Sequence, residues 1–226
     1  MKAALAEFIG TFTLVFIGAG AGALADSSGG GLVSVAFAHG LALMVVVYTW
    51  GSISGAHVNP AVTLGVAFTG RINSLTAVIY WTAQFLGGVA AAYLLLYLIG
   101  TSQGLGQTIG SLTPGVATSG PNASAVKTIV VEAVLTFFLM TSVFSSGVLN
   151  KNGNLAGVAI GLVLTMDILM GGTLTGGSMN PARTFGPAVA LRNVQPMDYF
   201  WMYLIGPFIG ATVGALLYDQ MFTTKD

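Results

Sequence analysis

The chain contains six apolar stretches, each of about 20 residues, the length that a helix needs to cross the hydrocarbon core of a bilayer. They cover approximately residues 3–25, 33–51, 77–99, 128–148, 155–172 and 199–221. Only 6% of the 226 residues are charged, against about a quarter in an ordinary soluble domain, so most of the surface cannot face water. The sequence therefore predicts an all-α membrane protein.

Two shorter apolar segments, about 60–69 and 181–191, are half the length of a span, and each begins with Asn-Pro-Ala. They belong to an internal repeat, because a shift of 121 residues places Asn59-Pro60-Ala61 on Asn180-Pro181-Ala182. Each half then holds three full spans and one half-span, and since three is odd the second half must be inverted relative to the first. We expect one channel domain over 1–226, with six transmembrane helices, two half-helices and inverted repeats at about 1–100 and 127–226, joined by a loop over 100–126.

The two Asn-Pro-Ala motifs have the chemistry of helix starts. Proline is favoured at the first helical position, and asparagine just before it is a good N-cap. The residues concerned are Asn59, Pro60, Ala61, Asn180, Pro181 and Ala182. If the half-helices meet at the midplane, both positive dipole ends point there and repel cations, including a hopping proton. The two asparagine amides would then offer hydrogen-bond donors to a passing water molecule.

The segments Ile53-Ser-Gly-Ala-His-Val-Asn-Pro-Ala-Val62 and Gly176-Gly-Ser-Met-Asn-Pro-Ala-Arg183 resemble the two signature loops of the aquaporin (major intrinsic protein) family. The resemblance covers essentially the whole chain. It implies a passive channel for water that excludes protons and ions, assembled as a homotetramer with one pore per subunit. It also implies that Glu7 and Glu132, at matching places in the two halves, accept hydrogen bonds from the backbone of the half-helix loops. His57 is expected to hold its loop by hydrogen bonding.

The same resemblance implies a selectivity filter of His39, Ile168, Gly177 and Arg183, most similar to that of plant vacuolar (tonoplast) aquaporins. An arginine at membrane depth must face water or a partner, which favours a place on the pathway. Strict water channels usually have histidine where this chain has Ile168. Isoleucine removes ring donors from one wall and glycine adds room, so ammonia, hydrogen peroxide and urea become expected permeants beside water.

Other functions are weighed against this one. Glycerol facilitators usually carry an aspartate and a basic residue where Thr184 and Ala188 stand, but Leu204 replaces a tryptophan frequent in water channels, which leaves glycerol transport open. A secondary transporter would need ionisable coupling residues, and few exist beyond Asp167. Asp167 could pair with Arg183 or contact another subunit. No nucleophile with a base and no metal cluster is evident, so we expect no enzyme, metal or cofactor. Zero net charge argues against nucleic acid as a partner.

Basic residues give a weak indication of orientation. Lys2, Arg71, Lys151 and Lys225 fall on the side of the termini, and Lys127 and Arg192 fall opposite. This bias favours cytoplasmic termini. Short termini and compact loops predict a prokaryotic inner membrane, whereas the filter leaves a eukaryotic vacuolar membrane as the alternative.

Small residues also recur at four-residue spacing, which in lipid lets helices approach closely. The runs are Gly18/Gly22, Gly157/Gly161 and Gly206/Gly210/Gly214.

Overall fold

A computed structural model describes residues 1–100, 104–116, 118–191 and 197–222. Within them, six helical segments are long and apolar enough to cross a membrane. They are α1 (Lys2–Leu24), α2 (Gly31–Ser54), α4 (Ser74–Ile99), α5 (Ala125–Ser142) with its π-helical continuation Val143–Val148, α6 (Ala156–Thr175) preceded by the 3-10 turn Gly153–Leu155, and α9 (Phe200–Phe222). The spans predicted from hydropathy are thus confirmed. Arg192 and Lys225, which entered the orientation argument, lie outside the described residues.

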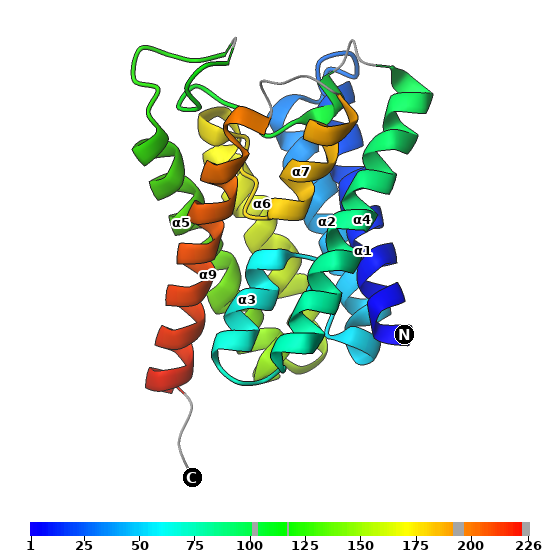
Figure 1. Cartoon of the computed structure of the whole chain (residues 1–226), viewed down its shortest axis with the longest axis vertical. Helices are drawn as coiled ribbons and strands as arrows, with labels where there is room; N and C mark the ends of the chain where they lie inside the picture. Colours follow the sequence, from blue (N-terminus) through cyan, green and yellow to red (C-terminus); the bar gives the residue numbers. More distant parts are fainter. Residues whose placement is uncertain (101–103, 117, 192–196, 223–226) are drawn as a thin grey trace.

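Two short helices, α3 (Pro60–Phe68) and α7 (Pro181–Ala190), lie between the long ones. In Figure 1 they occupy the middle of the bundle, with α1, α2 and α4 on one side and α5, α6 and α9 on the other. Each short helix packs against a long helix from the other half of the chain, α3 against α9 and α7 against α4. The two halves therefore interlock at the centre of the molecule.

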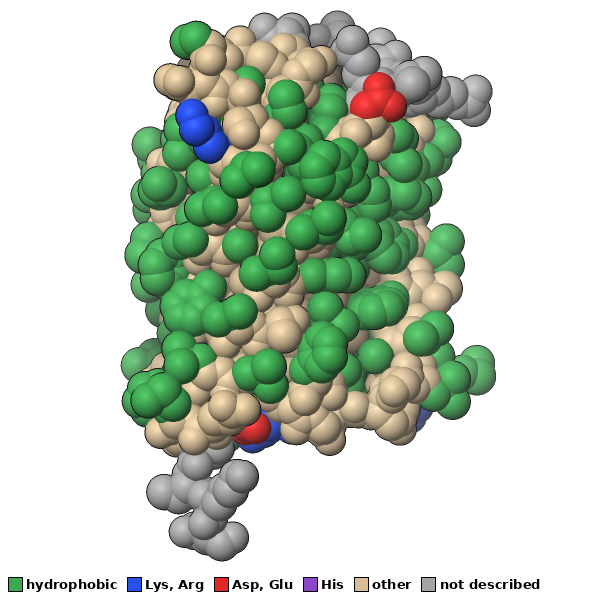
Figure 2. Space-filling model, turned by 60° about the vertical axis from the view of Figure 1, so that its left-hand side comes forward, with side chains coloured by type: hydrophobic (Ala, Val, Ile, Leu, Met, Phe, Trp, Pro, Cys, Tyr) green, Lys and Arg blue, Asp and Glu red, His purple; other side chains and the backbone are tan. Residues whose placement is uncertain are grey.

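The start of α1 and the end of α9 lie toward the same end of the molecule, as an even number of spans requires (Figure 1). We call this end the terminal side. The opposite end, the loop side, carries the connection between α4 and α5, including the 3-10 turn Gly104–Gly106. On the face shown in Figure 2, apolar side chains cover the middle of the molecule and charged ones lie near its two ends, as expected for a surface in contact with lipid.

Glycines bring several pairs of helices into backbone contact, and two of these crossings involve the runs of four-residue spacing. A Cβ atom at Gly206 would lie 2.9 Å from the carbonyl oxygen of Ile129, so α9 rests directly on α5. A Cβ at Gly161 would lie 2.6 Å from the carbonyl oxygen of Gly40, so α6 rests on α2. The close packing predicted from small-residue spacing is found at these crossings, whereas Gly18 on α1 faces a side chain.

Candidate functional site

The N-termini of α3 and α7 meet inside the bundle. Asn59 caps α3, its Oδ1 accepting from the N–H of Ala61 at 2.8 Å. Asn180 caps α7, its Oδ1 accepting from the N–H groups of Ala182 and Arg183 at 3.0 and 3.3 Å. Pro60 and Pro181 stand at the first helical positions, where their missing N–H leaves no bond unmade. Both helix dipoles therefore direct their positive ends at one place.

The two asparagine amides join the halves reciprocally. Asn59 Nδ2 donates to the carbonyl oxygen of Met179 at 2.8 Å, and Asn180 Nδ2 donates to that of Val58 at 2.9 Å. An amide nitrogen has two hydrogens, so one N–H of each asparagine stays available after this bond is made. Both asparagines line an internal cavity. The second N–H of each is thus the group that can serve a permeant there.

The residues whose carbonyls accept these bonds have left-handed backbone conformations. Val58 has φ of 43° and Met179 has φ of 53°, although neither is glycine. Such a conformation is costly for a β-branched residue and persists only where its surroundings hold it. The support comes from two buried glutamates.

Glu7 on α1 accepts from the N–H of His57 at 2.9 Å and from that of Val58 at 2.6 Å. Glu132 on α5 accepts from the N–H of Ser178 at 3.0 Å and from that of Met179 at 2.7 Å. Both carboxylates are fully buried. Each glutamate therefore orders the loop that leads into one short helix.

The cavity has a volume of about 730 Å³. It passes both asparagines and reaches Arg71 and Asn154 on the terminal side and His39 and Arg183 toward the loop side. Between these points its wall is mostly apolar, including Leu43, Val62, Val66, Leu139, Ile160 and Leu164. An apolar channel with a few convergent polar groups can pass small neutral molecules with little binding on the way.

Arg183 is held from two sides at the loop-side end of the cavity. Its Nη1 donates to the carbonyl oxygen of Gly106 at 2.7 Å, and its Nε donates to Nε2 of His39 at 3.3 Å. Because arginine can only donate, His39 Nε2 must accept, and the ring hydrogen is therefore on Nδ1, which lies 2.9 Å from the carbonyl oxygen of Val35. A neutral imidazole and a buried guanidinium thus face each other across the end of the cavity.

Ile168 and Gly177, the other two residues expected at the filter, lie together but outside the lining of this cavity. A Cβ at Gly177, whose φ is 55°, would lie 3.4 Å from Cα of Ile168. Ile168 is buried at 1% exposure. The cavity ends at the Arg183–His39 pair, so the wall role of Ile168 and Gly177 stays a prediction.

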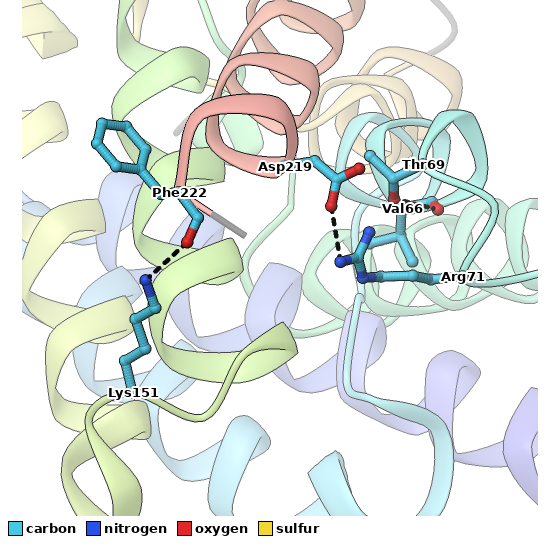
Figure 3. A network of polar contacts seen from close by, with 6 residues as sticks. All are labelled: Val66, Thr69, Arg71, Lys151, Asp219 and Phe222. Atoms are coloured by element: carbon cyan, nitrogen blue, oxygen red, sulfur yellow. Dashed lines mark hydrogen bonds and ion pairs between the residues drawn. The ribbon is translucent and has the colours of Figure 1, made fainter. Parts of the chain in front are cut away.

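Polar contacts hold the end of α9 near Arg71, which lines the terminal-side end of the cavity (Figure 3). Arg71, just after α3, makes an ion pair of 2.7 Å with Asp219 on α9 and stacks its guanidinium over the ring of Phe144. Lys151 donates to the carbonyl oxygen of Phe222 at 3.2 Å. The end of α9 is thereby fastened beside the mouth.

Two residues singled out in the sequence need a separate account. His57 Nδ1 lies 3.1 Å from Oγ1 of Thr63, so its ring bonds within the loop and first short helix. Asp167 is buried at 1% exposure, and its Oδ2 has no hydrogen-bond partner among the described residues. Asp167 makes no ion pair with Arg183, since the only ion pair within the described parts of the chain joins Arg71 to Asp219. A contact of Asp167 with another subunit stays a prediction. The described parts also hold no cluster of three or more His, Asp or Glu suited to a metal.

Several residues of the site escaped the sequence reasoning. Val58 and Met179 supply the carbonyls that fix the asparagines, and the repeat offset could have found them because they occupy equivalent positions. Gly106 supplies a carbonyl to Arg183 from a loop with no periodic pattern. Gln84, which bonds Glu7, has no counterpart in the second half.

Comparison with known proteins places the whole chain in one group. The family model for the major intrinsic protein matches residues 1–218. The chain is 42% identical to "Probable aquaporin TIP1-2" of Oryza sativa subsp. japonica, covering 98% of this chain and 86% of that protein. It is 41% identical to "Aquaporin TIP2-1" of Arabidopsis thaliana, covering 98% and 88%. The crystal structure of the aquaglyceroporin from Plasmodium falciparum superposes with a TM-score of 0.86 at 24% identity, covering 97% of this chain and 96% of that one, which shows a shared fold.

Proposed function

The chain belongs to the major intrinsic protein family, and we propose that it is a passive membrane channel for water and small neutral solutes that excludes protons and ions. The observation that carries this proposal is the meeting of two half-helices, with both capping amides on one apolar cavity. A permeant water can place its oxygen against the free N–H of Asn59 and of Asn180. Because the apolar wall elsewhere offers few hydrogen-bond partners, the water molecule is not bound tightly and passes through the channel.

Charge exclusion is assigned to two features. The N-terminal ends of α3 and α7 place partial positive charge at the midpoint of the pathway. Arg183 adds a full positive charge nearer the loop side, where its guanidinium bonds Gly106 and His39. A cation must pass both barriers without its hydration shell, and a proton cannot be relayed through a water whose oxygen is held by donors.

We propose that the filter consists of His39, Ile168, Gly177 and Arg183. His39 and Arg183 offer polar groups to the cavity, while the contact between Ile168 and Gly177 is apolar and lacks bulk on the glycine side. This composition supports a wider range of permeants than water alone, namely ammonia, hydrogen peroxide and urea. Glycerol is the limiting case by size.

The membrane and the assembly state are proposed on family grounds. Prokaryotic inner membrane was the first expectation from the sequence, but the TIP names of the plant relatives support the vacuolar alternative. A homotetramer with one pore per subunit is proposed from the family resemblance. Native mass spectrometry in detergent would test the assembly, with a monomer contradicting it.

The proposal is tested by reconstituting the chain in liposomes and recording stopped-flow light scattering after osmotic shock. We expect water permeability well above that of empty liposomes, linear in the gradient, with urea flux beside it and no proton leak by a trapped pH dye. Arg183→Val should keep water flux and raise leakage of charged solutes. Water permeability equal to that of empty liposomes would contradict the channel, and saturable or ion-coupled flux would indicate a transporter.

A further inference from the structure

We propose that Gly18, on α1, is a specificity-determining position of this channel, because the absence of a side chain there is what lets His39 reach Arg183. The inference rests on the proposed function and extends it to a residue outside the four expected filter positions. Gly18 is fully surrounded by protein and does not line the cavity itself. Instead, it leaves room for the ring of His39, which does line the cavity.

A side chain at Gly18 would collide with the ring of His39, most closely with its Cδ2. A Cβ built on Gly18 would lie 2.5 Å from Nε2 of His39 and 2.7 Å from its Cγ, closer than real Cβ atoms approach other heavy atoms. The same Nε2 accepts the 3.3 Å hydrogen bond from Nε of Arg183. A Cβ this close to Cδ2, Nε2 and Cγ at once lies over the face of the imidazole, so a methyl group at position 18 would push the ring out of the place in which Nε2 accepts from Arg183.

The His39 ring has little freedom to avoid such a methyl group. Its other nitrogen, Nδ1, donates to the carbonyl oxygen of Val35 one turn earlier in α2. A histidine side chain has only two torsions, so displacement of the ring strains this bond or moves the ring off its rotamer. The ring lies between α1 and the cavity, so displacement away from α1 carries it toward the passage.

Arg183, the hydrogen-bond partner of His39, is supported by the same turn of α1. Arg183 donates to the carbonyl oxygen of Gly106, and a Cβ on Gly106 would overlap the carbonyl group of Ala19. Gly18 and Ala19 are neighbours, so one turn of α1 supports both groups that close the loop-side end of the cavity. Gly20, on the same helix, differs, since a Cβ there would meet only the flexible end of Leu95, at 3.1 Å.

The experiment compares Gly18→Ala, His39→Ala, the double variant and the matched control Gly20→Ala in liposomes at equal protein content. Water and urea permeability are read by stopped-flow light scattering, and thermal unfolding in detergent checks folding. We expect Gly18→Ala to lower the urea-to-water permeability ratio by roughly fivefold, since pore diameter and lining donors set solute selectivity. Gly20→Ala should leave both permeabilities unchanged. In the His39→Ala background, Gly18→Ala should have no further effect on either.

Two results would overturn the inference. One is a Gly18→Ala variant with the water and urea permeabilities of the wild type. The other is an equal effect of Gly18→Ala with and without the His39 ring, because a general packing defect in α1 would act in both backgrounds. If urea does not pass the wild type, the same double-variant comparison is decided on water permeability alone. A wild type that adds no water permeability would contradict the proposed function instead.

Discussion

The two half-helix loops are supported by equivalent glutamates, but the surroundings of the two carboxylates differ. Glu7 accepts four hydrogen bonds, two on each oxygen, from the N–H groups of His57 and Val58, the hydroxyl of Ser54 at 2.6 Å and Nε2 of Gln84 at 2.7 Å. Glu132 accepts three: two on Oε1, from the hydroxyl of Thr175 and the N–H of Ser178, and one on Oε2, from the N–H of Met179.

The missing fourth donor has a simple origin. Gln84 comes from α4, four residues after Tyr80, whose hydroxyl donates to the carbonyl oxygen of Ser54. On α9 the equivalent Tyr203 donates to the carbonyl oxygen of Thr175, and the buried residue four positions later is Pro207, which has no donor. The second half instead places Asp167 near enough to Glu132 for electrostatic repulsion. The loop of the second half is therefore held by a less satisfied carboxylate, although it carries Arg183. Equivalent backbone geometry can thus be kept with unequal support.

The largest effect that separates the halves is expected from changing each glutamate to glutamine. In Glu7→Gln the new amide nitrogen faces two donors whichever oxygen it replaces, so two bonds are lost. In Glu132→Gln it can replace Oε2, where one bond is lost. With about 1–3 kcal/mol for each buried donor left unpaired, we expect losses of about 2–6 kcal/mol for Glu7→Gln and about 1–3 kcal/mol for Glu132→Gln. Thermal unfolding in detergent, followed by tryptophan fluorescence, would rank the two.

Equal destabilisation by the two glutamine variants would show that Gln84 adds nothing to the support of Glu7. Gln84→Leu is the matched control, since it removes the fourth donor and leaves the carboxylate in place. It should destabilise the protein less than Glu7→Gln does.

The capping asparagines predict a second, smaller difference in stability between the halves. Here the larger loss is expected for the variant in the second half. Asn180 caps two N–H groups and Asn59 caps one. Both alanine variants lose the bond from Nδ2 to the opposite loop. The loss of the N-cap typically adds about 0.5–2 kcal/mol, and this part should lie near the top of the range in Asn180→Ala and near the bottom in Asn59→Ala. Thermal unfolding would measure both, and a larger loss for Asn59→Ala would contradict the capping argument. Both variants should also lower water permeability.

Much of this architecture could be predicted because its causes are local or repeated. Hydrophobic length marks the spans, and Asn-Pro marks the starts of α3 and α7 whatever they pack against. The offset of 121 residues also pairs Ser54 with Thr175, whose hydroxyls bond Glu7 and Glu132.

The rest depends on contacts between segments that share no pattern. Nothing in the sequence near Gly106 indicates that its carbonyl meets Arg183, because any residue has a carbonyl and only the path of the loop decides its use. Gly18 is one of 32 glycines, and its four-residue spacing to Gly22 predicts helix packing in general, not a contact with the His39 ring. Asp167 could be recognised as unusual, but its nearness to Glu132 is a result of how α5 and α6 pack.

A change at Asp167 would make the electrostatic surroundings of Glu132 more similar to those of Glu7. Asp167→Asn keeps the shape of the side chain, removes the repulsion with Glu132 and replaces an unpaired buried oxygen or hydroxyl by an amide. We expect a gain in stability of roughly 1 kcal/mol, because the like-charge contact with Glu132 disappears while the buried polar atom stays unpaired in both proteins. The gain should vanish when Glu132 is already glutamine. A loss of stability in Asp167→Asn would mean that the acid has a favourable partner in the assembled protein.

The smallest effect is expected where the halves meet at the surface. Arg71 follows the short helix of the first half, and Asp219 lies on α9 of the second; their side chains are 30% and 27% exposed. Such a pair contributes less than about 1 kcal/mol, and salt screens it. Asp219→Asn should therefore lower the unfolding temperature slightly at low salt and not at all at high salt, with Arg71 still stacked on Phe144. The contrary result would be a fall in unfolding temperature that does not depend on salt and exceeds that of Glu132→Gln. It would show that the contact between Arg71 and Asp219 stabilises the packing of the two halves more than the buried carboxylate of Glu132 does.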